Sequence, residues 1–174
     1  MIAEKKPIKK RDARLLLDDI RSVHNVGSIF RTAETLGISR IYCAGTTPTP
    51  VDRFGRKRKD FAKVSLGAED MVAWEYIEKA GESVKRLKKE GFEVIALEQA
   101  DNSIDYKEVE FKTHSNSSNL QMILIILGNE VDGVSPKLLR LADVIAEIPL
   151  KGKKESLNVS VAAGVALFRW FDCV

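Results

Sequence analysis

The sequence predicts an α/β protein with a mostly parallel sheet and helices on both faces. Short apolar runs alternate with helical stretches along the 174 residues, which is the order typical of βαβ units. The most apolar run, residues 120–127, is expected at the centre of the sheet, where a strand is covered on both faces. A composition of 44% hydrophobic and 30% charged residues agrees with one soluble domain that has a sizeable core.

The first βαβ unit is predicted near the N-terminus. A basic, mobile arm over residues 1–14 precedes a strand at residues 15–20. A helix follows because apolar side chains recur at helical spacing, with Asn25 as its N-cap and Gly37 just beyond its end. Residues 38–44 then provide the second strand of the unit.

The middle of the chain contains one clear helix and one clear strand. Residues 51–63 are basic with interleaved aromatic side chains, and residues 64–77 are ambiguous between strand and helix. An amphipathic helix is predicted over residues 78–89 and a strand over residues 92–98. Residues 99–119 form a polar loop that has room for a short edge strand.

The C-terminal part ends in an apolar helix. Ser135, followed by proline, is expected to open a short helix, and residues 143–148 form the last strand. Ser156 or Asn158 is the expected N-cap of the final helix, whose apolar residues run nearly all round. Such a helix must be buried on most sides. Gly164 costs about 1 kcal/mol in a helix interior, which suggests a close packing partner.

Charge and cysteine content restrict the class of protein. The net charge is only +3, but basic residues cluster near the N-terminus, at residues 53–59 and at residues 151–154. Each cluster suits either a polyanion or a solvated surface. Without a signal core or an apolar run of about 18 residues, the chain is expected to be cytoplasmic and free of the membrane. Cys43 and Cys173 are then reduced thiols, and no metal-ligand pattern is present.

Three pairs of polar residues fall just beyond predicted strands. They are Asn25 with Arg31, Asn129 with Glu130, and Ser156 with Asn158. Open α/β sheets bind ligands at this edge, and the N-terminus of a helix there favours anions. The three pairs are therefore expected to share one site.

Common nucleotide-binding motifs do not account for the polar residues at this edge of the sheet. No two glycines have the G-x-G spacing of dinucleotide-binding proteins. Gly128 and Gly133 have the spacing of a phosphate-binding loop, but Val134 stands where that loop requires lysine.

Three segments resemble the motifs of the SpoU (TrmH-type) RNA ribose 2′-O-methyltransferases of the SPOUT superfamily. They are Asn25-x-Gly27-x-x-x-Arg31, Leu127-Gly128-Asn129-Glu130-x-x-Gly133, and Ile148-Pro149-Leu150 with Ser156-Leu157-Asn158-Val159-Ser160. The resemblance covers residues 15–170, and its one departure is Leu150, where methionine is common. It implies a single SPOUT domain over residues 15–174, a C-terminal trefoil knot, a homodimer, and S-adenosylmethionine as methyl donor to tRNA or rRNA, without a metal.

The resemblance also assigns roles to individual residues. The catalytic positions are Asn25, Arg31, Glu130, Ser156 and Asn158. The cofactor contacts are Leu97, Glu98, Leu127, Gly128, Asn129, Ile148, Leu150, Ser156 and Leu157. For the RNA, the basic clusters offer Lys9, Lys10, Arg11, Arg53, Arg56, Lys57 and Arg58.

Arg31 has a restricted chemical role in this hypothesis. A guanidinium is always protonated in proteins, so phosphate anchoring and stabilisation of a developing alkoxide suit Arg31 better than proton abstraction. Glu130 could orient that guanidinium. The hypothesis requires Arg31 and Asn158 to converge on one cleft, either within a chain or across the subunits of the dimer.

Two alternatives remain open from the residues. Taken singly, Asn25 and Ser156 suit plain helix caps, Glu130 a solvated loop acid, and Arg31 a surface residue. A protein that keeps the fold as a non-catalytic cofactor- or RNA-binding module would also retain these motifs.

Overall fold

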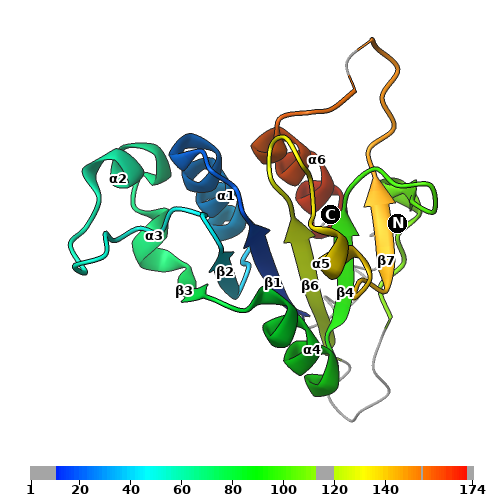
Figure 1. Cartoon of the computed structure of the whole chain (residues 1–174), viewed down its shortest axis with the longest axis horizontal. Coiled ribbons are helices and arrows are strands. Elements are labelled where there is room, and N and C mark those ends of the chain that lie inside the picture. Colours follow the sequence, from blue (N-terminus) through cyan, green and yellow to red (C-terminus); the bar gives the residue numbers. More distant parts are fainter. Residues whose placement is uncertain (1–10, 113–119, 154, 172–174) are drawn as a thin grey trace, which may run out of the picture.

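The computed structural model describes residues 11–112, 120–153 and 155–171. Its strands form one sheet of seven, in the order β3-β2-β1-β6-β4-β7-β5, and all neighbouring pairs are parallel (Figure 1). The strands are β1 (Arg11–Asp18), β2 (Arg40–Ala44), β3 (Ala73–Ile77), β4 (Glu93–Leu97), β5 (Ile104–Asp105), β6 (Gln121–Leu127) and β7 (Val144–Glu147).

The prediction of a central strand at residues 120–127 is confirmed. Strand β6 lies between β1 and β4, with Ile125 in register with Leu15 on one side and Ile95 on the other. Successive side chains of a strand point to opposite faces, so both faces of β6 need cover. Ile125 joins the core on one face, and Leu124 joins the core on the other.

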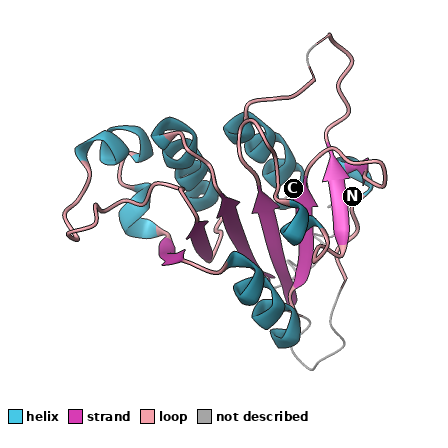
Figure 2. Ribbon diagram, viewed as in Figure 1, coloured by secondary structure: helices cyan, strands magenta, loops and turns pink. Residues whose placement is uncertain are grey.

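Helices cover both faces of the sheet (Figure 2). Helices α1 and α6 lie side by side on one face, near α2 and α3, whereas α4 and α5 cover the other face. The helices are α1 (Val23–Thr35), α2 (Lys59–Ser65), α3 (Ala68–Met71), α4 (Ala80–Glu90), α5 (Pro136–Leu139) and α6 (Val159–Phe171), with a short 3-10 turn at Tyr106–Glu108.

Strand β1 begins four residues earlier than the sequence predicts. Residues 11–14 belong to the strand and not to the arm, while residues 1–10 lie outside the described part of the chain. Ala13 is buried in the core, and the Arg14 guanidinium lies 4.4 Å above the Phe92 ring and pairs with Asp12. Alternation between apolar and basic residues hid this first part of the strand.

The ambiguous segment 64–77 contains both kinds of element. It holds the short helix α3 and then the edge strand β3, which pairs with β2. The predicted α4, β4 and edge strand β5 are confirmed within a few residues. Helix α1 begins at a different cap, because Ser22 accepts a hydrogen bond from the Asn25 N–H, and Asn25 lies inside the first turn.

Helix α6 is not buried on most sides within one chain, contrary to the sequence prediction. Ala163, Ala166 and Leu167 face the core, but Val161, Val165 and Phe168 are 51%, 39% and 44% exposed. Apart from its chain neighbours and the backbone of α6, no atom of the described residues lies within 4 Å of the position that a Gly164 Cβ would occupy. We call the set Val161, Val165 and Phe168 the α6 apolar face.

Candidate active site

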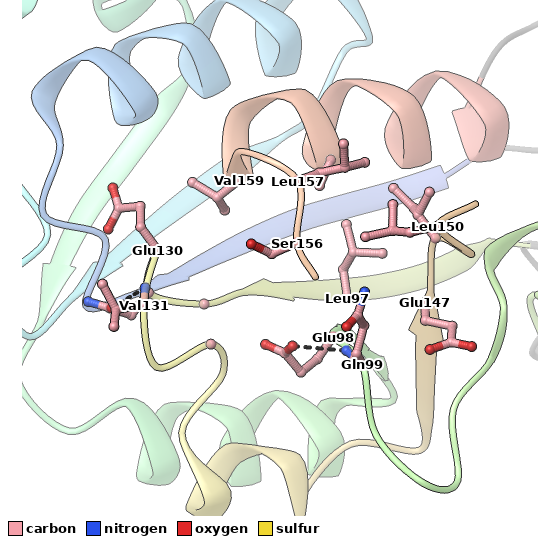
Figure 3. Close-up of a pocket in the computed structure, with 15 residues that line it drawn as sticks. Leu97, Glu98, Gln99, Glu130, Val131, Glu147, Leu150, Ser156, Leu157 and Val159 are labelled. Carbon is pink, nitrogen blue, oxygen red and sulfur yellow. Dashed lines mark hydrogen bonds between the residues drawn. The ribbon is translucent and has the colours of Figure 1, made fainter. Parts of the chain in front are cut away.

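A pocket opens at the carboxyl ends of β4, β6 and β7 (Figure 3). The loops that follow these strands enclose it together with the segment before α6. Its lining consists of Leu97, Glu98, Gln99, Gly128, Asn129, Glu130, Val131, Gly133, Glu147, Ile148, Leu150, Ser156, Leu157, Val159 and Ala162. The pocket therefore lies at the sheet edge where the sequence predicts a ligand site.

Most predicted cofactor contacts line this pocket. Leu97, Glu98, Gly128, Asn129, Ile148, Leu150, Ser156 and Leu157 all belong to the lining. Leu127 does not, because its side chain is 1% exposed and packs in the core beneath α1 and α6. The apolar run that identified β6 also determines this burial, so a contact from Leu127 to a ligand would come from its backbone.

The loop after β6 is held closed by its own backbone and by Asn129. The Asn129 N–H donates to the Gly133 carbonyl at 2.9 Å, and the Gly133 N–H returns a bond at 3.1 Å. The Asn129 Oδ1 accepts bonds from Val131 N and Asp132 N, and its Nδ2 donates to the Asp19 carbonyl. The Asn129 side chain thus shapes the pocket wall, since its amide is occupied by the loop.

Gly128 is required by this closed loop. A Cβ at Gly128 would lie 2.2 Å from the Gly133 carbonyl carbon and from the Val134 nitrogen, and both are backbone atoms. No side chain can therefore replace the hydrogen here without opening the loop.

One hydrogen-bonded chain joins three predicted catalytic residues. The Asn158 Nδ2 donates to the Asn25 Oδ1 at 3.0 Å, and the Asn25 Nδ2 donates to the Glu130 Oε1 at 2.8 Å. The Asn158 Oδ1 accepts bonds from the Ser160 N–H and hydroxyl and so caps α6. The start of α1, the loop after β6 and the start of α6 therefore meet through side chains.

The Glu130 carboxylate is bound by the N-terminus of α1. Its two oxygens accept the N–H groups of Arg21 and Ser22, each at 3.1 Å, besides the Asn25 amide. Partial burial opposes ionisation, but these hydrogen bonds outweigh it and lower the pKa of Glu130 below its ordinary value. Glu130 therefore orients Asn25, and the prediction that it orients the Arg31 guanidinium is wrong within the chain.

Arg31 lies outside the pocket lining. It follows Asn25 by six residues on α1, which corresponds to about 9 Å along the axis and about 240° around it. Its side chain is exposed. Within one chain the structure thus brings together Asn25, Glu130, Ser156 and Asn158, while Arg31 faces solvent.

Sequence reasoning missed several residues of the lining. Glu147 adds a second carboxylate beside that of the predicted Glu98, whose Oε2 accepts the Val134 N–H at 2.8 Å. The others missed are Gln99, Val131 and Ala162, and Gly133 and Val159 belong to the motifs but had no role assigned. Each lies within four residues of a recognised motif position, so extending the motifs by one turn would have found them.

The basic cluster at residues 53–59 is largely paired. Arg56, Lys57 and Arg58 form exposed ion pairs with Asp52, Asp70 and Asp60. Arg53 has no acidic partner within residues 11–112, 120–153 and 155–171, and its guanidinium lies over Phe54. The predicted RNA contacts Lys9 and Lys10 fall outside the described residues.

Arg11 has a structural role far from the pocket. Its guanidinium donates to the Gln121 Oε1 and to the Trp170 carbonyl, and it lies over the Phe171 ring. These contacts are at the start of β1, the opposite end of the strand from the pocket.

Other ligand classes find little support in the described residues. Across the described ranges, no three His, Cys, Asp or Glu side chains come together as a metal site would need. In the same part of the chain, no helix has the length and apolarity needed to cross a membrane. Cys43 is buried as a free thiol, and burial raises its pKa to about 12.

Comparison with known proteins places these features in one family. The SpoU rRNA Methylase family matches residues 12–168 of the chain, which include the loops of the pocket and the start of α1. The chain belongs to the SpoU rRNA Methylase family.

Curated relatives that match this chain are named as RNA methyltransferases. The tRNA (guanosine(18)-2′-O)-methyltransferase of Aquifex aeolicus is 29% identical, covering 92% of this chain and 69% of that protein. The enzyme of the same name from Thermus thermophilus is 30% identical, and the match covers 92% of this chain and 74% of that protein. The Escherichia coli enzyme is 27% identical, and the match covers 97% of this chain and 65% of that protein. The SpoU chain described here thus spans about two thirds of these relatives.

Solved structures share the fold. An AdoMet-bound rRNA methyltransferase from Sinorhizobium meliloti superimposes with a TM-score of 0.78 at 26% identity, over 91% of this chain and 55% of that one. The A. aeolicus TrmH/SpoU tRNA modifying enzyme gives a TM-score of 0.77 at 27% identity, over 95% of this chain and 77% of that one. The parallel sheet and its helical layers are therefore those of SpoU methyltransferases.

Proposed function

We propose that this protein transfers a methyl group from S-adenosylmethionine to a ribose 2′-hydroxyl of a structured RNA, either tRNA or rRNA. The observation that carries the proposal is the chain Asn158–Asn25–Glu130, in which residues of three separate motifs meet beside one pocket. The names of the relatives and the AdoMet-bound neighbour support the same reaction.

The pocket lining suits S-adenosylmethionine. Leu97, Ile148 and Leu157 provide apolar surface of the kind that holds an adenine ring. The carboxylates of Glu98 and Glu147 favour a ligand that carries positive charge. When bound, the cofactor supplies a methyl group on a cationic sulfur, so the reaction needs no metal.

The residues around the pocket divide the remaining work. Asn25 and Asn158 fix the position of the start of α6 relative to the loop after β6. The Ser156 hydroxyl lies in the pocket lining and is available to hydrogen-bond the ribose or the cofactor (Figure 3). Asn129 and Gly128 keep the pocket wall closed.

Arg31 acts on the RNA in this proposal. A guanidinium carries a fixed positive charge in proteins, so Arg31 binds the phosphate next to the target ribose and stabilises the negative charge that develops on the 2′-oxygen as its proton passes to water and it attacks the methyl carbon. Its exposed position on α1 is suited to meeting a macromolecule.

A homodimer is part of the proposal. Val161, Val165 and Phe168 form an apolar face on α6, and Leu157 at the pocket rim is also 41% exposed. Contiguous apolar surface of this kind marks an interface. A second copy of the chain on this face would bury α6 on most sides, as its sequence predicts, and would place a partner near Gly164.

Two further features belong to the proposal. We expect the C-terminal trefoil knot of SPOUT proteins, because the segments after β6 and β7 both border the pocket before the chain continues into α6. We also expect a cytoplasmic location, in keeping with the free thiol of Cys43 and an RNA substrate.

The test combines cofactor binding with methyl transfer. Calorimetry should detect binding of S-adenosylmethionine, and total RNA incubated with purified protein and labelled cofactor should gain 2′-O-methylated nucleosides after digestion. Arg31→Ala should lower transfer at saturating RNA by about 100-fold or more, whereas Arg86→Ala, at an exposed arginine of α4, should not. Cofactor binding without transfer to any RNA would instead support a non-catalytic module.

A further inference from the structure

A second cleft lies at the same edge of the sheet, beside the ends of β2 and β3. Its lining includes Phe54, Trp74 and Tyr76 together with Arg53, Arg56 and Arg58. We call it the aromatic cleft. Phe54 is 66% exposed and Tyr76 is 50% exposed, although large aromatic side chains normally gain free energy by burial. Exposed rings next to arginines suggest a ligand that has both a flat surface and negative charge.

Phe54 is presented by a rigid hairpin. Val51 and Lys57 form an antiparallel bridge, and the Asp52 carboxylate accepts the N–H groups of Phe54 and Arg56 at 2.8 and 3.0 Å. Holding an exposed ring in place before binding lowers the entropic cost of stacking on it. Tyr76 is fixed as well, since its hydroxyl donates to the Gly45 carbonyl at 3.2 Å.

Charge in the aromatic cleft is positive but mostly compensated. Arg56 and Arg58 have ion pairs with Asp52 and Asp60, whereas Arg53 has no acidic partner in the described ranges and lies 4.8 Å from the centroid of Phe54. One unpaired guanidinium can bind one phosphate group, but it cannot bind a long stretch of nucleic-acid backbone. Binding should therefore depend on stacking more than on phosphate contacts.

The aromatic cleft is connected to the pocket by two short loops, after β2 and after β1, that are bonded to each other. The Thr47 hydroxyl donates to the Leu17 carbonyl and accepts the Ile20 N–H, and Thr46 is bonded to Asp19. The loop after β1, to which Thr46 and Thr47 are bonded, supplies the Arg21 N–H to Glu130. Strand β2 is two positions from β6 in the sheet, which is on the order of 10 Å at ordinary strand spacing. One RNA can therefore contact both sites.

We propose that the aromatic cleft binds an unpaired nucleotide of the substrate RNA, with its base stacked against Phe54 and Tyr76 and its phosphate at Arg53. The inference rests on the proposed RNA methyltransferase function. Bases in a duplex have no free face, whereas bases in loops can turn outward and stack on aromatic side chains or guanidinium planes. The cleft thus selects RNA with a single-stranded nucleotide near the methylated ribose.

Binding of two labelled probes, a 12-nucleotide oligouridine and a 12-base-pair RNA duplex, tests the proposal by fluorescence anisotropy. Phe54→Ala should raise the Kd for oligouridine between about 5-fold and 150-fold, the range for loss of one base–aromatic stack. Phe54→Trp should restore binding, and Tyr76→Phe should bind more tightly than Tyr76→Ala. Met71→Ala removes another exposed apolar side chain, 74% exposed, and should leave binding unchanged.

Methyl transfer separates this inference from the function on which it rests. If the parent protein methylates RNA, Phe54→Ala should raise the KM for RNA while the Kd for S-adenosylmethionine stays the same. An unchanged KM, or an equal loss of affinity for the duplex, would overturn the proposal that the aromatic cleft binds an unpaired nucleotide. The proposed methyltransferase function would still stand. A parent protein that methylates no RNA would instead overturn the proposed function.

Discussion

Asn158 and Asn25 are 133 positions apart in the sequence, and their side chains are joined by a hydrogen bond of 3.0 Å. Asn25 is only 8% exposed and passes the connection on to Glu130. A buried polar chain of this kind is stable only when each member keeps its partner. The start of α6, the start of α1 and the loop after β6 therefore hold one another in position.

Replacing Asn25 by alanine should damage both the site and the fold. Glu130 and Asn158 each lose a partner, which should lower the free energy of unfolding by about 1–3 kcal/mol. Methyl transfer should fall by about 100-fold at a temperature where the variant stays folded. Asn102→Ala, at an exposed turn, is the matched control. Wild-type turnover in Asn25→Ala would remove the residue from the catalytic set.

Glu130 should make stability depend on acid pH. Its pKa is lower in the folded chain than its ordinary value of 4.5. The ionised form is thus favoured by folding, and this contribution is present above pH 4.5 and is lost as the pH falls through the lower, folded value. Denaturant titrations between pH 7 and pH 3 should show a smaller acid-dependent loss for Glu130→Gln than for the parent. Parallel curves would show that Glu130 is not stabilised in the folded state.

A methyl group at Gly128 should open the pocket wall. The new carbon would lie 2.2 Å from two backbone atoms of the same loop, so the closed form is sterically excluded. Gly128→Ala should lose stability by about 1–3 kcal/mol and weaken binding of S-adenosylmethionine in calorimetry. Gly152→Ala, where no atom of the described residues beyond the chain neighbours lies within 4 Å of the added carbon, should leave stability and cofactor affinity near the parent values. Equal behaviour of the two variants would contradict the closed loop.

A charge on the α6 apolar face should produce monomers. Val165 and Phe168 are exposed in one chain, so Val165→Asp or Phe168→Asp should fold but resist burial against a second copy. Analytical ultracentrifugation should detect a dimer for the parent and a monomer for the variants. Leu66→Asp replaces an exposed apolar residue away from α6 and should remain dimeric. A monomeric parent would refute the proposed dimer.

Much of the fold follows from local patterns in the sequence. The apolar run of β6 specified a central strand, and the helical spacing before Gly91 specified α4, because both signals arise from side-chain periodicity alone. The motif residues Glu130, Ser156 and Asn158 were identified because they follow strands whose carboxyl ends share one edge.

The tertiary structure decided which partner each of these residues has. Asn25 resembled a helix cap in the sequence, yet Ser22 fills that role and Asn25 bonds to Glu130 and Asn158, which approach only after the sheet has formed. Leu127 and Arg31 matched motif positions equally well, but packing directs the first into the core and leaves the second in solvent. A local pattern records how a side chain is spaced along its own element. Contacts between elements depend on how the sheet brings distant segments together.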